Sequence, residues 1–596
     1  MSTSEPHHRV LFIPELLENI FCRSEDVRTL ARSALVCKQW SDLALNTLWY
    51  ELDTPVNLFK ILAPLEESQD EEDYDKLIFR NTPTSAAWVR FDYYARKVRM
   101  LAYIEDPAEG EYELDVSSNI SPRVFRDLSR ARSPQRLLPN LKGLTWQSDD
   151  LVTLLSSQVL LHDRIKALSF AMPILQQSQS MSDYFTSITS KIPSLQLMAI
   201  WLNRQSPSLL ELEAEVVDLL RGLRELTHVG IPFYSLTSKM AEAISQLEKV
   251  LVVDFDGECY KRPIGYESYA GNYFGAPREN LPRFSPQLQV NSFPSLTYLA
   301  IGLHLQDLMS DHILRRRLFP PSLQRLVIQE TGNTTPAIVE SFLESIAVSH
   351  PHLSTLSLQL RLSDFPRSLP LLDTPRITFT TIKPILGMRS LIEFMISHDY
   401  PLSLTDRDMQ ELAIAKPLLQ YLSLNSEPGY PLESSLSLAA LLPFAEHCPS
   451  MIELKLYMDT TISDFPTLQT NMQRANAVSL LGCEFSPGFS RIEDTRKVML
   501  FLGQILRTSP YPTTLGQPNF LTGNYDRSYE ACEEVRKRMR KWEEVSRALP
   551  FVVDARMDEL RRVDTWAGRV WEVCSPYLPP SVRPPHPSDC DPGVSR

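Results

Sequence analysis

The sequence predicts an α/β chain, in which a short N-terminal group of helices precedes an irregular solenoid of parallel strands forming one curved sheet, with helices on its convex side. Three observations predict this arrangement. A dense apolar run, ALVCKQWSDLALNTLW, occupies residues 34–49. A short apolar phrase recurs along the middle of the chain. Segments with helical spacing of apolar residues separate the copies of that phrase.

Residues 13–49 are expected to form short helices. Pro14 suits a first helical turn, because its missing N–H would have no helical partner there. Apolar residues follow at helical spacing. Ser24, followed by two acidic residues, is a suitable cap for a second helix. The next stripe, at steps of three and four, is Leu30, Ala34, Cys37, Trp40 and Ala44.

This segment carries more apolar surface than it can enclose. A helix that is apolar nearly all round must be buried by something, and a unit below about 40 residues usually needs a partner. Trp40 and Trp49 must therefore pack on the rest of the chain or on another protein. We expect Trp49, near the junction, to pack on the domain that follows.

The same residues resemble the F-box. That motif typically begins Leu-Pro-x-Glu-[Leu/Ile], continues with Leu-Val-Cys-[Lys/Arg]-x-Trp in its third helix, and often closes with Leu-Trp. Here the matching stretches are IPELL at 13–17, LVCKQW at 35–40 and LW at 48–49. Ile13 replaces the usual leucine, and CRS at 22–24 stands where many F-boxes have an apolar residue.

The resemblance implies binding to a Skp-type adaptor and, through it, to a cullin–RING ubiquitin ligase. By motif position it assigns the adaptor-binding residues to two places. The first helix contributes Ile13, Pro14, Leu16, Leu17 and Ile20, and the third helix contributes Leu35, Val36, Cys37 and Trp40. The role expected of Trp40 is adaptor contact, or holding the adaptor-binding helices in place.

The middle of the chain repeats an apolar-x-x-apolar-x-apolar phrase. Its copies are PNLKGLTW (139–146), RIKALSF (164–170), PSLQLMAI (193–200), LRELTHV (223–229), LEKVLVV (247–253), PSLTYLAI (294–301), PSLQRLVI (321–328), PHLSTLSL (351–358), SLIEFMI (390–396), PLLQYLSL (417–424) and PSMIELKL (449–456). Most neighbours lie about 24–32 residues apart, close to the length of a leucine-rich repeat. We expect one strand per phrase, with stacking required to bury each unit.

The repeats are irregular, because the asparagine of well-formed leucine-rich repeats is mostly absent, with Asn203 and Asn425 as near candidates. An ordinary α/β domain with short strands is the alternative. The expected division is an F-box at 10–52, a helical linker at 53–135 with the acidic loop EESQDEEDYD at 66–75, an irregular leucine-rich-repeat solenoid at 136–490, a C-terminal helical cap at 491–575 and a disordered tail at 576–596. GYESYAGNYFGAPREN at 265–280 is expected to be an inserted loop.

Composition argues against several classes of protein. The formal charge of −13 argues against nucleic-acid and anionic membrane partners. The basic run RKRMRK at 536–541 is flanked by glutamates and is expected to be a solvated helix face. Eight scattered cysteines without a Cys-x-x-Cys pair indicate reduced thiols. With no apolar membrane span and no signal-peptide core, we expect a cytoplasmic and/or nuclear protein.

No catalytic motif for nucleotide, zinc-protease or serine-hydrolase chemistry occurs. We expect no enzyme activity, no cofactor and no metal. The nearest metal-like pair, His350 and His352, is expected to lie exposed in a turn.

The resulting hypothesis is a substrate receptor of an SCF-type (Skp–cullin–F-box) E3 ubiquitin ligase, whose repeats bind an unknown protein target. The alternatives are a Skp-bound or free interaction scaffold without a role in ubiquitination, and a binding solenoid that the N-terminal helices merely cap. The layout resembles the large F-box families of mushroom-forming fungi. The residues expected on the concave face have mixed polarity, which indicates no particular class of ligand. They are Thr297, Tyr298, Gln324, Arg325, Ser354, Thr355, Gln420 and Tyr421.

Overall fold

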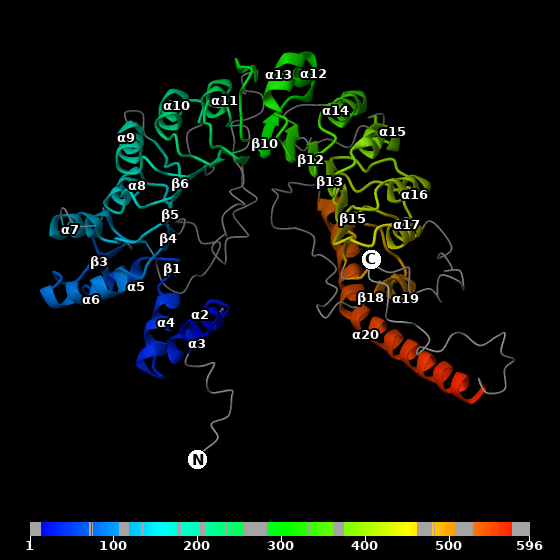
Figure 1. Cartoon of the computed structure of the whole chain (residues 1–596), viewed down its shortest axis with the longest axis horizontal. Coiled ribbons are helices and arrows are strands. Elements are labelled where there is room, and N and C mark those ends of the chain that lie inside the picture. The colour runs from blue at the N-terminus through cyan, green and yellow to red at the C-terminus, as the bar shows by residue number, and fades with distance from the viewer. Residues whose placement is uncertain are drawn as a thin grey trace, which may run out of the picture. The chain divides into compact units, whose positions relative to one another are not determined.

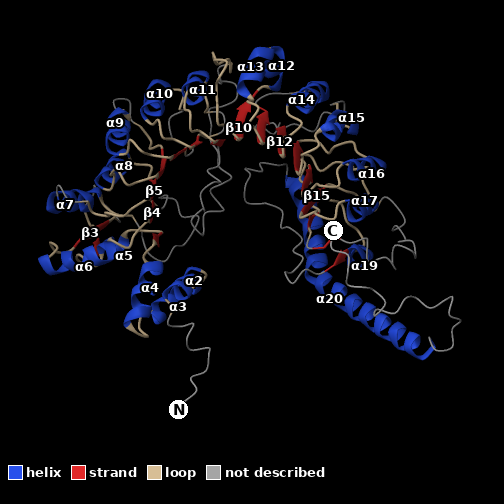
Figure 2. Ribbon diagram, in the orientation of Figure 1, coloured by secondary structure: helices blue, strands red, loops and turns tan. Residues whose placement is uncertain are grey.

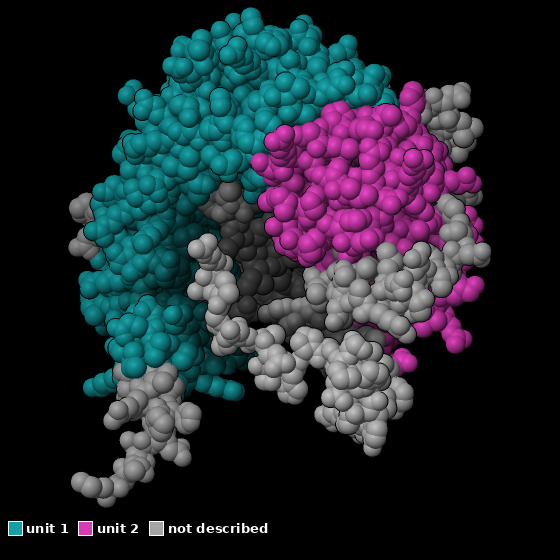
Figure 3. Space-filling view, turned by 45° about the vertical axis from the view of Figure 1, so that its right-hand side comes forward, with its two compact units in different colours: residues 1–365, 519–526 teal, residues 366–518, 527–596 magenta. Residues whose placement is uncertain are grey.

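The computed structural model places the chain in two compact units. Unit 1 comprises residues 1–365 and 519–526, and unit 2 comprises residues 366–518 and 527–596 (Figure 3). The structure describes residues 13–24, 26–70, 73, 76–105, 119–132, 136–175, 180–202, 209–232, 235–254, 283–330, 334–360, 375–461, 480–481, 483–507 and 529–574. The inserted loop at 265–280, the tail at 576–596 and Asn203 lie outside the described residues.

Unit 1 is built on a parallel sheet whose strands follow one another in chain order (Figure 1). Its strands are β1 (Glu51–Leu52), β4 (Met100–Ile104), β5 (Gly143–Gln147), β6 (Ala167–Ala171), β7 (Leu197–Trp201), β8 (His228–Gly230), β9 (Val252–Asp254), β10 (Tyr298–Leu303), β11 (Arg325–Glu330) and β12 (Thr355–Leu360). The eight apolar phrases between residues 139 and 358 each end in one of these strands, as expected, from β5 to β12.

Equivalent residues of successive phrases lie side by side. Leu299 of β10 pairs with Leu326 of β11, which pairs with Leu356 of β12. These three side chains are at most 1% exposed. Because side chains alternate along a strand, every second residue reaches the same covered face of the sheet. Stacked repeats thus bury an apolar layer that no single repeat could enclose.

Helices cover one face of this sheet, on the convex side of unit 1 (Figure 2). They are α7 (Pro122–Arg132), α8 (Leu151–Ser156), α9 (Ser182–Lys191), α10 (Glu213–Gly222), α11 (Ser238–Ser245), α12 (Leu305–Ser310), α13 (His312–Leu318) and α14 (Pro336–Ser349). Several begin at a capping side chain, as where Thr237 accepts the main-chain N–H of Met240 at 3.2 Å. The α/β solenoid is therefore the fold of this unit.

The sheet starts earlier than the sequence pattern indicates. Strand β4 belongs to it, although residues 53–135 were expected to be a helical linker, and so does β1, at the end of the expected F-box range of 10–52. The same range holds α5 (Val56–Phe59), α6 (Ser85–Ala95) and an antiparallel pair, β2 (Leu65–Glu67) with β3 (Leu77–Phe79). The phrase before β4, RKVRMLAYI, lacks the Pro-x-Leu opening that marks most of the others.

The acidic segment at 66–75 is tied down where the structure describes it. Arg123 of α7 forms ion pairs with Asp70 at 2.6 Å and with Asp73 at 2.7 Å. Lys76 pairs with Glu105 at 3.3 Å. Since a basic side chain on α7 bridges two of its acids, the described part of this segment is held against α7.

Two buried histidines just before repeat phrases link neighbouring repeats. His162 donates from Nε2 to the Leu138 carbonyl at 2.9 Å, and His350 donates from Nε2 to the Phe319 carbonyl at 3.1 Å. His350 is only 6% exposed. The expectation of two exposed imidazoles is therefore wrong for His350, because its ring satisfies a carbonyl of the preceding repeat.

Unit 2 continues the same pattern on its own parallel strands. They are β13 (Glu393–His398), β14 (Tyr421–Leu424), β15 (Glu453–Leu456) and β17 (Glu484–Ser486), and a second pair joins β16 (Leu480–Leu481) to β18 (Leu506–Arg507). The accompanying helices include α15 (Phe379–Ile382), α16 (Asp406–Ala415) and α17 (Leu442–His447). Asn425, at φ +53°, accepts the His398 main-chain N–H at 2.9 Å and donates to the Tyr400 carbonyl at 2.8 Å.

Two helices close unit 2, namely α19 (Thr495–Ile505) and α20 (Tyr529–Cys574). One face of α20 is buried: Val535, Trp542, Val545, Leu549 and Val553. The Trp542 ring meets Phe485 of β17 with centroids 6.3 Å apart, and its indole N–H donates to the Ser490 carbonyl at 2.9 Å. The apolar face of α20 therefore covers the last strand.

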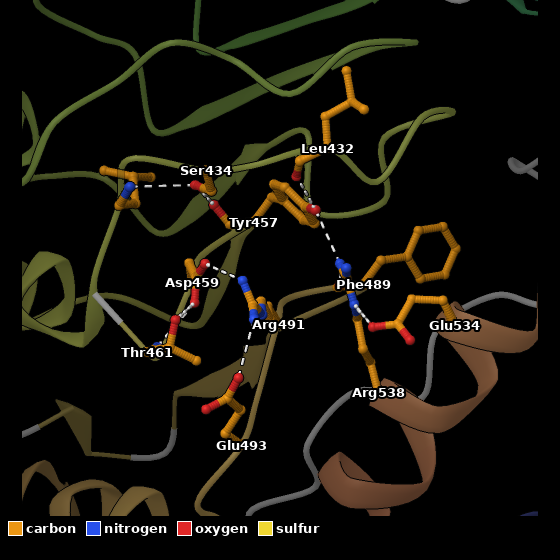
Figure 4. A network of polar contacts seen from close by, with 11 residues as sticks. Leu432, Ser434, Tyr457, Asp459, Thr461, Phe489, Arg491, Glu493, Glu534 and Arg538 are labelled. Carbon is orange, nitrogen blue, oxygen red and sulfur yellow. Dashed lines mark hydrogen bonds and ion pairs between the residues drawn. The ribbon is translucent and has the colours of Figure 1, made fainter. Parts of the chain in front are cut away.

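Polar contacts hold α20 in the same place (Figure 4). Arg538 donates to the Tyr457 hydroxyl and to the Phe489 carbonyl, each at 3.2 Å. Lys541 donates to the Ile492 carbonyl at 3.2 Å. The run at 536–541 is thus not a wholly solvated face, because two of its cations bind main-chain and phenol oxygens. No helix in the described part of the chain is long and apolar enough to cross a membrane.

Candidate functional site

The N-terminal helices form a small domain at the start of unit 1. They are α2 (Pro14–Cys22), α3 (Val27–Ser33) and α4 (Lys38–Leu48). Pro14 occupies the first turn of α2, as expected. Asp26, rather than Ser24, caps α3, and its carboxylate accepts the main-chain N–H groups of Arg28 at 3.0 Å and Thr29 at 3.1 Å. The Thr29 hydroxyl and these N–H groups lower the pKa of Asp26.

The domain has its own apolar core. Leu17 and Phe21, one helical turn apart on α2, pack with Leu30 of α3 and Ala44 of α4, and all four are at most 5% exposed. Trp40 is half-buried, and its ring meets Phe21 edge-on with centroids 5.5 Å apart. Trp40 therefore packs against the core of the domain. Leu17 is 1% exposed and belongs to this core, not to the surface.

The other expected residues on α2 lie at the surface. Ile13, Leu16 and Ile20 are 41%, 41% and 48% exposed, and Pro14 is also exposed. They alternate with Leu17 and Phe21 around the helix, so one side of α2 faces the core and another remains uncovered.

The remaining expected residues lie in the turn before α4, not within the third helix. The N–H of Leu35 donates to the Arg32 carbonyl at 3.0 Å, and that of Val36 donates to the Ser33 carbonyl at 3.2 Å, which ends α3. Leu35 is 86% exposed and Val36 is 62% exposed. Cys37 is exposed as well and directly precedes α4 in extended backbone. A turn between two helices thus presents these side chains to solvent.

We refer to these residues as the apolar surface of the N-terminal domain: Ile13, Pro14, Leu16, Ile20, Leu35, Val36 and Cys37. Seven of the twenty large apolar side chains that are exposed among the described residues lie between residues 13 and 50, and two of them, Val27 and Tyr50, were not expected from the motif. Single exposed apolar side chains are normal, but a concentration of them marks an interaction site.

The C-terminal side of the domain is attached to the sheet of unit 1. Trp49 contacts Tyr94 of α6, with ring centroids 4.7 Å apart. The Tyr93 hydroxyl donates to Asp42 at 3.1 Å, and Lys97 donates to Asn46 at 2.6 Å. Trp49 therefore packs on the following domain, as expected. The apolar surface takes no part in these contacts.

The residues expected on the concave face differ in how far their side chains are exposed. Tyr298, Arg325 and Thr355 pair across β10, β11 and β12. Tyr298 is 8% exposed and Thr355 is 4% exposed, whereas Arg325 is exposed and lies over the Tyr298 ring at 4.9 Å. Among the described residues, no group of three or more His, Cys, Asp and Glu side chains gathers as a metal site.

Fold and surface together define a small helical domain with an exposed apolar surface, joined to an α/β solenoid. The family model described as F-box-like matches residues 14–55, so the helical domain is F-box-like. A search of curated proteins gives no match. Among solved structures, "Crystal structure of Rad7 and Elc1 complex in yeast" is similar at 15% identity and a TM-score of 0.34, covering 81% of this chain and 98% of that one.

Proposed function

We propose that the chain is the substrate-recognition subunit of an SCF-type E3 ubiquitin ligase. In this proposal the F-box-like domain binds a Skp-type adaptor, and through it a cullin–RING ligase, while the solenoid binds a protein target. One observation carries the proposal: the F-box-like domain closes its own core yet leaves Ile13, Leu16, Ile20, Leu35 and Val36 between 41% and 86% exposed.

The apolar surface has the character of a protein-binding site. Each large apolar side chain that leaves water contributes roughly 1.5–3 kcal/mol, and a few such anchors carry most of the energy of an interface. Leu35 and Val36, in the turn, are the most exposed of these side chains and would contribute the most free energy on burial in an interface. Leu17 and Trp40 support the surface from within, so we leave Leu17 out of the contact residues and assign Trp40 to holding the helices.

A domain that served only to cap the solenoid would bury its apolar residues against the sheet. Here Trp49, Asp42 and Asn46 make the contacts with α6 and with Lys97. The apolar surface is left over for a partner. The receptor proposal therefore accounts for a feature that the capping alternative does not.

The proposed contribution of this non-catalytic subunit, in the cytosol or nucleus, is proximity. A target held near a ubiquitin-loaded enzyme reacts in an effectively unimolecular step, which is a large gain over two freely diffusing partners. The adaptor-binding end and the target-binding solenoid would then need a fixed spatial relationship. The contacts of Trp49 and Lys97 tie the F-box-like domain to the first strands of unit 1.

Co-expression with a Skp-type adaptor, followed by gel filtration, tests the proposal. We expect the wild type to co-elute with the adaptor and Leu35→Ser/Val36→Ser to lose co-elution while its circular dichroism melt stays unchanged. Val89→Ser, which alters an equally exposed apolar side chain on α6 of the same unit, is the matched control and should co-elute.

A wild type that does not co-elute would reject adaptor binding. A second assay reconstitutes the cullin–RING ligase with the chain and with proteins that the solenoid captures. If the chain co-elutes with the adaptor but no captured protein receives ubiquitin, the scaffold alternative is favoured instead.

A further inference from the structure

A group of basic side chains lies where three neighbouring strands of unit 1 begin. We call Arg99, Lys142, Arg164 and Lys166 the cationic edge. Arg99 directly precedes β4, Lys142 precedes β5 and Lys166 precedes β6. The main-chain N–H of Lys142 donates to the Arg99 carbonyl, and that of Lys166 to the Lys142 carbonyl, each at 2.7 Å. Adjacent strands lie about 4.8 Å apart, so three cationic residues fall within roughly 10 Å.

Neutral groups hold these cations in place. Arg99 donates to the Arg96 carbonyl at 2.6 Å, and Arg164 donates to the Asn140 side-chain oxygen at 3.1 Å. Lys166 donates to the Ser194 hydroxyl at 3.0 Å. These contacts fix the positions of the charges without neutralising them, because carbonyl, amide and hydroxyl groups carry no net charge.

The cationic edge also lacks acidic partners. Within the part of the chain that the structure describes, no ion pair joins Arg99, Lys142, Arg164 or Lys166 to a carboxylate. Lys142 is exposed.

The next repeats along the same edge differ. The positions equivalent to Lys142 and Lys166 are Gln196, Thr227 and Leu251, each directly before its strand. Lys249, three residues before β9, pairs with Glu225 at 2.5 Å. A cation thus stands directly before β4, β5 and β6 but not before β7, β8 or β9, in a chain whose formal charge is −13. This pattern is a local feature, not a result of composition.

We propose that the cationic edge binds a short acidic peptide segment of a partner protein. Side chains on one face of an extended peptide repeat every 6.6–6.8 Å, and those one helical turn apart lie about 5–6 Å from each other. The helical spacing is close to the separation of about 4.8 Å between the strands that carry the cations, and the extended spacing exceeds it by about 2 Å. An acidic peptide can therefore bring one carboxylate to each of Arg99, Lys142 and Lys166.

A nucleic acid fits the same edge less well. Its phosphates extend far beyond four cations, and a protein of charge −13 repels the rest of such a polyanion. A peptide with a few clustered acidic residues can pair with the cations and carries no further negative charge beyond them. The proposal does not depend on adaptor binding, since the edge belongs to the strands of unit 1 and the test contains no adaptor.

Fluorescence anisotropy of the full chain with a labelled octapeptide of alternating Glu and Asp tests the inference. We expect binding that weakens as salt is raised from 50 to 500 mM, and no binding of the matched Gln/Asn octapeptide. Lys142→Gln/Lys166→Gln should weaken binding about tenfold, because two charge contacts are lost. Lys249→Gln, whose native ammonium is already paired, should stay within about twofold of the wild type.

The single variant Lys142→Gln controls for misfolding, because the Lys142 side chain is exposed. It should weaken binding about threefold and leave the melting temperature unchanged. Absence of wild-type binding at 50 mM salt would overturn the inference, as would equal binding by the double variant. Tighter binding of a single-stranded ten-nucleotide DNA than of the acidic octapeptide would overturn the assignment of the ligand.

Discussion

The indole ring of Trp49, just past the end of α4, lies with its centroid 4.7 Å from the ring centroid of Tyr94 on α6, at an interplanar angle of 40°. This contact joins the F-box-like domain to the segment that leads into β4. Strand β1, which starts two residues after Trp49, pairs with β4 directly. The F-box-like domain and the first strands of unit 1 are therefore continuous in structure as well as in sequence.

We predict that Trp49 and Tyr94 stabilise the chain together. A double-mutant cycle of Trp49→Ala and Tyr94→Ala should give a coupling energy of about 0.5–1.5 kcal/mol, because aromatic pairs contribute that much beyond their buried area. Urea unfolding followed by far-ultraviolet circular dichroism measures it. Strictly additive single effects would show that the two rings do not interact.

Trp40 and Leu35 should behave differently although both belong to the F-box motif. Trp40→Ala removes a ring that packs edge-on against Phe21, so we expect a loss of about 2–4 kcal/mol in the free energy of unfolding. Leu35→Ala, at a side chain 86% exposed, should change it by less than about 0.5 kcal/mol. The same urea experiment decides this, and a stable Trp40→Ala variant would contradict the supporting role of Trp40.

His350 should make stability depend on pH. Burial lowers its pKa below the ordinary value of 6.5, the neighbouring His352 lowers it further, and the hydrogen bond to Phe319 opposes this. Because the folded state disfavours the charged imidazole, the unfolded state binds more protons as pH falls below about 6.5. Stability should then be full above that pH and decrease on acidification until the folded-state pKa is passed.

Melting temperatures of the wild type and of His350→Gln between pH 7.5 and 5 test this dependence. We expect a shallower decrease for His350→Gln, whose amide can still donate to the Phe319 carbonyl but does not titrate. His352→Gln, at the exposed ring nearby, is the matched control and should keep most of the wild-type slope. Equal slopes for wild type and His350→Gln would contradict the prediction.

The cover provided by α20 should be worth several kcal/mol to unit 2. Trp542→Ala removes a ring that is 5% exposed and breaks its hydrogen bond to Ser490, so we expect a loss of about 3–5 kcal/mol. Arg547→Ala, at the exposed Arg547–Glu543 pair on the same helix, should cost less than about 0.5 kcal/mol. Hydrogen exchange of β17 amides reports the change, and unchanged protection in Trp542→Ala would rule out this role.

Gly488 is a position where only glycine fits. Its φ is +51°, and a Cβ there would lie 2.1 Å from the Ser426 carbonyl oxygen. Gly488→Ala therefore combines an unfavourable backbone conformation with a clash against main chain, and we expect it to destabilise unit 2 by more than about 2 kcal/mol. A thermal melt within a degree of the wild type would show that the turn can rearrange.

Much of the fold was predictable because it follows from local periodicity. The phrases that begin near Leu141, Leu296 and Leu419 each placed a strand within a few residues of where it lies. Strands β1 and β4 were missed, since β1 is only two residues long and the phrase of β4 lacks a proline. The side chain that caps α3 was also missed, because Ser24 and Asp26 are both good caps and lie only two residues apart.

The sequence by itself determined the helices of the F-box motif, the order of the strands and the apolar character of the layer between strands and helices. These depend on residue spacing along the chain. Only the tertiary structure decided which apolar residues are surface and which are core: Leu16 and Leu17 are adjacent, yet one is 41% exposed and the other 1%. It also decided that His350 is buried and that Arg99, Lys142 and Lys166, about twenty to forty residues apart, lie side by side. Parallel strand pairing brings together residues of different repeats, and no pattern within one repeat contains that information.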